Sequence, residues 1–182
     1  MIGSPGTASA PPAFERLAAY HDRDRFDCGE ESLNAYLRRY ARQNADRNLG
    51  VTHVAVESPG DTRILGYYTL LSRVVRRDVL PRPSKFPPDG AGVVLLGRLA
   101  VDLSAQGKRI GTAMLLRALR QTEAAAQNIG IHALVVNALN DRARAWYLGF
   151  EFQPLADDPH HLFLPVTAIR ELGLLGDSDV SP

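Results

Sequence analysis

The sequence predicts one α/β (α+β) domain, in which a mixed, twisted sheet is flanked by helices. Residues 93–102 and 131–138 are nearly continuous apolar runs, which are typical of strands buried on both faces. A helical stretch, residues 110–127, separates them, so a right-handed crossover makes the two strands parallel and the first of them central. Residues 51–57 and 64–75 flank a Ser-Pro-Gly-Asp turn with alternating, β-branched and aromatic side chains, which predicts an antiparallel hairpin.

Further elements flank this central unit. Apolar residues recur at helical spacing from Glu30 to Asn48, which predicts one amphipathic helix ended by Gly50. Residues 76–92 hold four prolines in a loop too long for a plain connection, which is a feature of functional loops. Near the C-terminus we expect a short capped helix at 140–148, strands at 150–152 and 161–166, and a last helical turn or two at 167–172.

Composition limits the architecture and the class of protein. The 182 residues are 45% apolar, which suffices for the core of one domain. Glycine, proline and small polar residues predict flexible tails at 1–13 and 176–182, leaving a folded unit at 14–175. The net charge of +1 does not favour nucleic acid or membrane, and the chain has neither a signal-peptide pattern nor a long apolar run. A single cysteine excludes an intrachain disulfide, so we expect a cytoplasmic protein.

The turn before helix 110–127 has the strongest chemical pattern in the chain. Backbone amides at a helix N-terminus carry partial positive charge, and glycines let a ligand approach closely, so such a turn suits a pyrophosphate. The alternative is a plain strand-to-helix turn whose glycines relieve steric strain, and spacing alone favours neither. The turn matches neither the glycine-rich pattern of nucleotide hydrolases nor that of dinucleotide-binding proteins. It reads Gln106-Gly107-Lys108-Arg109-Ile110-Gly111.

This junction resembles the acetyl-CoA motif of the Gcn5-related N-acetyltransferases (GNAT family), in which Arg or Gln precedes two spaced glycines after such a strand. Gln106, Gly111 and the preceding Arg-Leu-Ala-Val-Asp match, whereas Arg109 stands where the motif has glycine. For an arginine there to offer its backbone N–H, its side chain must turn outward and its φ must be negative. The resemblance implies the GNAT fold, with two central parallel strands that splay around acetyl-CoA.

The same resemblance assigns candidate cofactor-binding residues. Asn137 and Asn140 sit where related enzymes contact the pantetheine arm or the cofactor phosphates, although Asn140 also suits a plain helix cap. The pantetheine arm would lie along the main chain of Leu99, Ala100 and Val101. The pyrophosphate would bind at Gln106, Gly107, Lys108, Arg109, Ile110, Gly111 and Thr112.

Blocks along most of the chain resemble the acetyltransferase toxins of bacterial toxin–antitoxin pairs. They are F-D-C-G at 26–29, G-Y-Y-T-L at 66–70, L-G-R-L-A-V-D at 96–102, A-W-Y at 145–147 and D-P at 158–159. This resemblance implies acetylation of the α-amine of aminoacyl-tRNA, which blocks translation, and neutralisation by a ribbon-helix-helix antitoxin. Whether a homodimer forms stays open.

Tyr147 aligns with the catalytic tyrosine of this family. An amine that attacks the thioester displaces a CoA thiolate, which needs a proton, and a phenol of pKa about 10 holds one at neutral pH. From the residues alone, the alternative is an aromatic side chain packed on a short helix beside Trp146. The family usually has Gly-Phe four residues after the tyrosine, where this chain has Glu151-Phe152, so Gly149 is the candidate to supply the turn.

Local basic segments are candidates to bind tRNA. Arg38 and Arg42 lie on the first predicted helix, and Arg76 and Arg77 follow the hairpin; each phosphate contact would add salt dependence. For any single arginine the alternative is an ordinary solvated surface. The five histidines have no metal-ligand spacing beyond one adjacent pair, so no metal is assigned.

Two other functions stay open beside the tRNA-acetylating toxin. One is a GNAT enzyme that acetylates a small amine or a protein. The other is a non-catalytic protein that binds acetyl-CoA or an antitoxin, with which the departures at Arg109 and Glu151 are compatible. The leading hypothesis expects acetyl-CoA as co-substrate, aminoacyl-tRNA and an antitoxin as partners, and no membrane.

Overall fold

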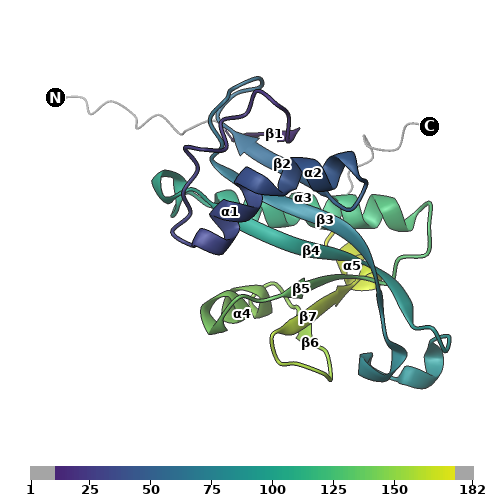
Figure 1. Cartoon of the computed structure of the whole chain (residues 1–182). Helices are drawn as coiled ribbons and strands as arrows, with labels where there is room; N and C mark the ends of the chain where they lie inside the picture. Colours follow the sequence, from purple (N-terminus) through teal and green to yellow (C-terminus); the bar gives the residue numbers. More distant parts are fainter. Residues whose placement is uncertain (1–10, 175–182) are drawn as a thin grey trace.

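A seven-stranded sheet in the order β1-β2-β3-β4-β5-β7-β6 forms the centre of the computed structural model, which describes residues 11–174. Of its neighbouring pairs, β4–β5 is parallel and the others are antiparallel. This mixed sheet, with β4 in the middle, confirms the predicted fold class (Figure 1). The strands are β1 Ala13–Arg16, β2 Val51–Val56, β3 Gly66–Val75, β4 Ala91–Val101, β5 Ala133–Asn137, β6 Gln153–Pro154 and β7 His161–Pro165.

Helices cover both faces of the sheet (Figure 1). Successive strand residues point to opposite faces, and Tyr67 packs in a core with α1 and α2 while Tyr68 packs in a core with α3. Among residues 11–174, no helix has the length and apolar character needed to cross a membrane. The helices are α1 Glu31–Arg39, α2 Ala41–Asp46, α3 Ile110–Ala126, α4 Asp141–Leu148 and α5 Val166–Glu171, with short 3-10 turns η1 Arg77–Val79, η2 Pro83–Lys85 and η3 Leu103–Ala105.

The two parallel strands separate after a short paired stretch. β4 pairs with β5 over residues 94–96. Directly after this stretch Leu96 pairs with Leu70 of β3 and Arg98 pairs with Thr69, so Gly97 is the extra residue of a β-bulge that re-aims β4. β4 then continues along β3 to Val101, whereas β5 ends at Asn137. The strands therefore splay as the GNAT resemblance implies.

The predicted helix from Glu30 to Asn48 is two helices, α1 and α2. Tyr40 interrupts the helical geometry at φ −113° and ψ −30°, although its amide still donates to the Tyr36 carbonyl over 2.9 Å. The expected end at Gly50 is wrong: α2 ends at Asp46, and Asn48 takes the left-handed conformation, with φ +55°. Asparagine visits this conformation more readily than most residues, because its short polar side chain bonds locally.

Other differences from the predictions lie at the ends and in the loops. β1 was not predicted; it begins at Ala13, inside the predicted N-terminal tail, and pairs with β2. The rest of the predicted tails, 1–10 and 175–182, lies outside the described residues. Residues 150–152 form the turn after α4, and the strand is β6 instead. β4 is not buried on both faces throughout, since Arg98 is exposed.

Candidate active site

A cavity of about 550 Å³ opens at the end of β4, where this strand has parted from β5. Three of its walls are the last residues of β4, the turn that leads into α3, and α4 with the Trp146 side chain. The fourth wall is the segment from Cys28 to Leu33, which enters α1. The splay of the parallel strands thus produces a hollow on which four separate parts of the chain converge.

The N-terminus of α3 faces this cavity with free backbone amides. Arg109, at the N-cap position, makes no capping hydrogen bond through its side chain, and Ala113 makes the first hydrogen bond, to the Arg109 carbonyl. Among the described residues, nothing accepts from the N–H groups of Ile110, Gly111 and Thr112, which line the cavity. Because such amides carry the positive end of the helix dipole, this end of the cavity suits a phosphate group.

Gln106 and two glycines shape the turn before α3. Gln106 Nε2 donates to the carbonyl oxygens of Val101 at 3.1 Å and Cys28 at 3.3 Å, and so ties the turn to two walls of the cavity. Gly107 has φ +78°, and a Cβ atom built on it would meet nothing within 4 Å. A Cβ atom on Gly111 would lie 3.6 Å from Val101 and 3.9 Å from the Trp146 ring. Both glycines therefore leave open space around the free amides.

Arg109 and Glu151 adopt a left-handed backbone at the two positions where the GNAT pattern has glycine. Arg109 has an exposed side chain, which meets the first condition set for it, but its φ is +60°, so the second condition, a negative φ, is not met. Glu151 has φ +66° and Gly149 has φ −63°, so Gly149 does not supply the turn after α4. At both positions the backbone has the conformation that favours glycine, and a residue with a Cβ atom adopts it at a free-energy cost of roughly 1–2 kcal/mol.

Most of the predicted cofactor-binding residues meet in this cavity. Asn140 also caps α4, where its side-chain oxygen accepts from the Ala143 amide at 2.9 Å. Lys108 lies in a neighbouring cavity and Asn137 in another one, so the structure does not bring these two into the same hollow. Sequence reasoning missed Cys28, Leu33, Arg142 and Trp146, which reach the site through tertiary packing. The predicted residues present are Leu99, Ala100, Val101, Gln106, Gly107, Arg109, Ile110, Gly111, Thr112 and Asn140.

Tyr147 lies next to the cavity, not in its lining. Its side chain is 8% exposed and packs at ring-centroid distances of 4.9 Å from Trp146 and 5.4 Å from Phe152. The hydroxyl makes no hydrogen bond to another described residue, and burial raises the pKa of this phenol above its ordinary value. The phenol is therefore protonated throughout the neutral range and holds a proton that no protein acceptor uses.

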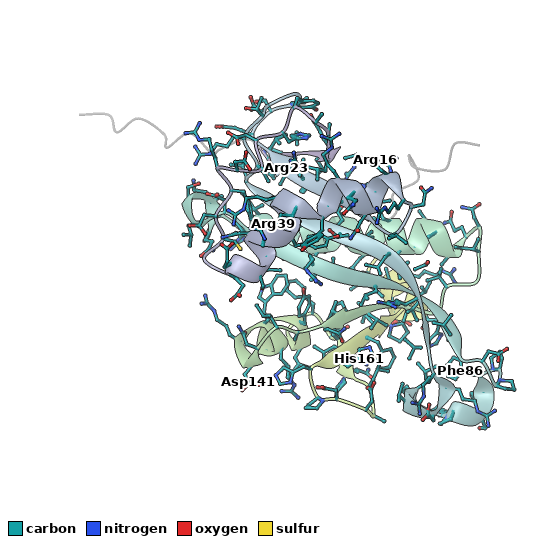
Figure 2. The ribbon with its side chains drawn as sticks, in the orientation of Figure 1. Arg16, Arg23, Arg39, Phe86, Asp141 and His161 are labelled. Atoms are coloured by element: carbon teal, nitrogen blue, oxygen red, sulfur yellow. The ribbon has the colours of Figure 1, made fainter. Side chains whose placement is uncertain are left out.

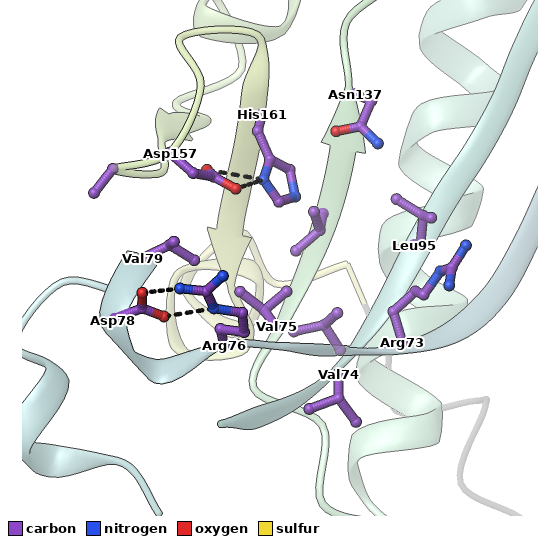
Figure 3. A pocket seen from close by; sticks show the side chains of 13 residues that line it. Arg73, Val74, Val75, Arg76, Asp78, Val79, Leu95, Asn137, Asp157 and His161 are labelled. Carbon is purple, nitrogen blue, oxygen red and sulfur yellow. Dashed lines mark hydrogen bonds and ion pairs between the residues drawn. The ribbon is translucent and has the colours of Figure 1, made fainter. Parts of the chain in front are cut away.

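A second cavity, of about 580 Å³, lies on the sheet face opposite α3 (Figure 3). Leu95 of β4 and Val135 of β5 line it, whereas their neighbours Leu96 and Val136 pack with α3. At its rim His161 Nδ1 lies 2.9 and 3.0 Å from the two carboxylate oxygens of Asp157. Arg76 also lines it and pairs with Asp78, which lowers the pKa of that carboxyl. Sequence reasoning found no role for the histidine, because nothing in the sequence shows that the Asp157 carboxylate faces its ring.

The model of the acetyltransferase (GNAT) family matches residues 14–150 of this chain. The chain belongs to the GNAT acetyltransferases. It is 38% identical over 170 residues, 93% of this chain and 98% of the relative, to the tRNA-acetylating toxin of Mycobacterium tuberculosis. It is 27% identical over 165 residues, 84% of this chain and 89% of the relative, to the probable toxin TacT of Sinorhizobium fredii. This protein is therefore an acetyl-CoA-dependent N-acetyltransferase of the toxin branch.

Solved structures of toxins share the fold of this GNAT acetyltransferase. A tyrosine-to-phenylalanine mutant of KacT has a TM-score of 0.84 at 34% identity, over 89% of this chain and 99% of that one. AtaT complexed with acetyl-methionyl-tRNAfMet has a TM-score of 0.82 at 33% identity, over 89% and 99%. AtaTR bound with acetyl-CoA has a TM-score of 0.77 at 31% identity, over 90% and 98%.

The residues of the first cavity fit the acetyl-CoA that GNAT acetyltransferases use. Its free α3 amides and open glycines are suited to the diphosphate, and Arg109 and Arg142 line it as positive charges. The splayed end of β4 has no strand on its β5 side, which leaves main-chain groups free for an amide-bearing arm. Within residues 11–174, no group of three or more His, Cys, Asp or Glu side chains is placed to hold a metal ion.

The arginines predicted to contact tRNA lie in two separate regions of the acetyltransferase. Arg38 on α1 and Arg42 on α2 belong to one, and the Arg38 guanidinium lies 2.6 Å from Glu31. Arg76 and Arg77 belong to the other, at the end of β3. Figure 2 marks the two regions by Arg39 and by Phe86, which lie well apart in that view.

Proposed function

We propose that this acetyltransferase transfers the acetyl group of acetyl-CoA to the α-amine of an aminoacyl-tRNA and thereby blocks translation. The observation that carries the proposal is a pair of cavities beside the β4–β5 splay, one with free helix N-terminal amides and one lined by Arg73 and Arg76. The acceptor class follows from likeness along nearly the whole chain to the tRNA-acetylating toxin of M. tuberculosis.

The first cavity would hold acetyl-CoA along its length. The amides of Ile110, Gly111 and Thr112 would bind the pyrophosphate, and Gln106 would keep the turn in place through its bonds to Val101 and Cys28. The main chain from Leu99 to Val101 would bind the pantetheine arm, which would direct the thioester toward the splay after Leu96. This arrangement would present the acetyl carbon between the two cavities.

Tyr147 would supply the proton that the departing thiolate needs. Its raised pKa keeps the hydroxyl protonated at neutral pH, and no described residue accepts from it. The ring packs against Trp146 and Phe152, which fixes the position of the hydroxyl next to the first cavity. Tyrosine-to-phenylalanine mutants of the relatives KacT and AtaT have been crystallised, and their folds match this one.

The acceptor would enter the second cavity from the side of the β3–η1 region. Arg73 and Arg76 line this cavity, and Arg77 follows in the chain. Arg76 pairs with Asp78, whereas Arg73 and Arg77 form no salt bridge to another described residue and would be available to the phosphates of the tRNA acceptor end. Arg38 and Arg42 would then contact a more distant part of the tRNA. A tRNA, which extends far beyond the amino acid, is the kind of acceptor that can use both regions.

We further propose that a ribbon-helix-helix antitoxin neutralises this cytoplasmic toxin. AtaT has been crystallised bound to the C-terminus of the antitoxin AtaR, and KacTA has been crystallised with DNA. Co-expression with a ribbon-helix-helix protein, where one is encoded beside this gene, should restore growth. Light scattering of the purified toxin would show whether it forms a homodimer.

Acetylation of charged tRNA by the purified protein tests the proposed function. The full chain is incubated with radiolabelled acetyl-CoA and charged tRNA, deacylated tRNA, or a small amine. We expect label on charged tRNA, released as acetyl-amino acid by mild base, and none on deacylated tRNA. Expression without an antitoxin should arrest growth, and the Tyr147→Phe variant should not. Label on the small amine at equal efficiency would instead identify an ordinary small-molecule acetyltransferase.

A further inference from the structure

His161 and Asp157 form a hydrogen-bonded pair that faces the second cavity (Figure 3). His161 Nδ1 lies 2.9 Å from one carboxylate oxygen and 3.0 Å from the other. A carboxylate can only accept, so Nδ1 carries the proton and Nε2 of the neutral ring is a free proton acceptor. Nε2 has no hydrogen-bond partner among the described residues, and the side chain is 20% exposed. The pair thus presents an oriented base to the cavity.

Strand register places His161 beside the point where acetyl-CoA is expected to end. The last β4–β5 pair is Leu96 with Val136, and Asn137 is the next residue, at the mouth of the splay. His161 of β7 is the direct partner of Asn137 in the antiparallel β5–β7 pair. Paired residues of neighbouring strands lie about 5 Å apart, so His161 is one strand away from the splay and on the same face as Asn137.

His161 and Tyr147 lie on opposite faces of the sheet at this point. Asn137 and His161 face the second cavity, whereas Tyr147 packs in the core that α3 and Val136 share. A thioester held in the splay would therefore have an acid on one side and a base on the other. Acyl transfer to an amine needs this division, since the amine loses protons where it approaches and the thiolate gains one where it departs.

We propose that His161 is the general base of this acetyltransferase and that Asp157 positions it. An α-amine of pKa about 8 is largely an ammonium ion at neutral pH and cannot attack in that form. His161 Nε2 would take one proton from the ammonium, and the amine nitrogen would form a C–N bond to the acetyl carbon. The C–S bond then breaks, and Tyr147 gives its proton to the sulfur. The second proton of the amine nitrogen returns to the tyrosinate through solvent, and His161 releases its proton to water, so the step is balanced.

The charged groups around His161 agree with this role. From the β6–β7 segment Asp157 faces it, and Asp158 and His160 lie further along. Arg73 of β3 and Arg76, which caps η1, line the same cavity, and Asp78 on η1 binds Arg76. The β4 and β5 residues that line the cavity bear no charge. Asp157 would stabilise the imidazolium that forms, while the arginines would hold the phosphates of the acceptor. The inference rests on the proposed amine-acetylating function.

The test compares His161→Gln with His160→Gln in the full-length protein. His160 is a matched control, because it also bonds carboxylates, Asp141 at 2.8 Å and Asp158, but it does not line the cavity. Initial rates with acetyl-CoA and charged tRNA are measured at pH 6.5 and pH 8.5. We expect the His161 variant to lose roughly 100-fold or more in kcat at pH 6.5, the range of a general base. At pH 8.5 the amine is mostly neutral without help, so the loss should shrink about tenfold or more.

Asp157→Asn is a second test that does not depend on the stability of the His161 variant. Asp157 is an exposed loop residue, and its amide can no longer fix the tautomer, so a smaller loss with the same pH dependence is expected. A His161 variant with wild-type kcat at pH 6.5, or one equally slow at both pH values, would overturn the proposal. A rise in KM alone would do the same and would make His161 a binding residue. If the wild-type protein acetylates only small amines, the variants are compared with such an amine as the acceptor. The role of His161 is then tested even though the proposed tRNA acceptor is wrong.

Discussion

The backbone amide of Asp27 donates a 3.1 Å hydrogen bond to the carboxylate of Asp102, which lies 75 residues further along the chain. The Leu103 amide donates in return to the Asp27 carbonyl at 2.8 Å. These bonds join the segment before α1 to the end of β4. Because Cys28 in that segment and Leu33 in the first turn of α1 line the first cavity, Asp102 helps to hold this cavity together.

Removal of the Asp102 charge should change how stability depends on pH. Burial raises the pKa of this carboxyl, but hydrogen bonds from Ser104 and the Asp27 amide outweigh it, so the pKa lies below its ordinary value. Because the pKa is lower in the folded state than in the unfolded state, the ionised carboxylate stabilises the fold when the pH is above the unfolded-state pKa of about 3.9. This stabilisation is lost as the pH falls through the folded-state pKa. Urea midpoints at pH 7 and pH 3 should show a smaller acid loss in Asp102→Asn than in the wild type. The exposed Asp24→Asn variant should follow the wild type.

Glycine at either left-handed position should stabilise the protein. Arg109→Gly and Glu151→Gly each remove the steric strain of a Cβ atom at positive φ. This gain exceeds the cost of the larger conformational entropy of the unfolded chain, so each variant should be more stable by up to about 1 kcal/mol. Thermal or urea unfolding measures the gain. Lys108→Gly is the control, since Lys108 is not at positive φ and should lose stability. Arg109→Gly should also bind acetyl-CoA equally well or more tightly; a large loss would mean that the arginine side chain holds the cofactor.

Gly111→Val should block acetyl-CoA while leaving the fold in place. A Cβ atom at this position makes ordinary contacts with Val101 and Trp146, but the two added methyl groups project into the cavity beside the free amides. Calorimetry should show at least a tenfold weaker Kd, which is about 1.4 kcal/mol. Acetyl-CoA should likewise raise the Tm of the wild type and not of this variant. Unchanged binding would place the pyrophosphate elsewhere; Gly130→Val, far from the cavity, is the control.

Tyr147→Phe should abolish turnover without loss of stability. The hydroxyl makes no hydrogen bond to a described residue, so its removal should change the unfolding free energy by at most about 1 kcal/mol. Loss of a general acid should lower kcat roughly 100-fold or more, with acetyl-CoA affinity little changed. Rapid-mixing rates and urea unfolding check the two halves. Normal turnover would point to water or the substrate as the proton source, and failure to fold would show that Tyr147 is a packing residue.

Acetylation of charged tRNA should fall steeply with salt, whereas acetylation of a small amine should not. Removal of one arginine that binds a phosphate should reduce the slope of log(kcat/KM) against log[salt] by about 0.7–0.9. Arg77→Gln should show this reduction, because the side chain is exposed and the residue lies between Arg76 and Asp78, which line the second cavity. Arg38→Gln should show less, because its guanidinium already lies 2.6 Å from Glu31. Equal salt profiles for both acceptors would contradict tRNA docking.

The central elements of the fold could be predicted because they depend on local sequence patterns. The apolar runs of β4 and β5, the amphipathic helix between them and the Asn140 cap of α4 all depend on residues near one another in the chain. The break at Tyr40 has no such signal, because no glycine or proline stands there. The two-residue β6 is too short to show a periodic pattern. β1 was not predicted, because its four residues do not show a strand pattern by themselves. They form a strand because the edge of β2 offers them hydrogen-bond partners.

The candidate site also has a part that local sequence determines and a part that the tertiary structure determines. The sequence alone determined the α3 turn and its amides, because a strand, two glycines and a helix N-terminus follow one another within a few residues. Only the tertiary structure decided that Asn137 faces the second cavity, that Arg109 and Glu151 take the backbone of glycine, and that His161 lies beside the splay. The positions of Asn137 and His161 depend on the register of β5 with β7, and the path of β4 at the splay depends on the bulge at Gly97; interactions between residues distant in the chain set both.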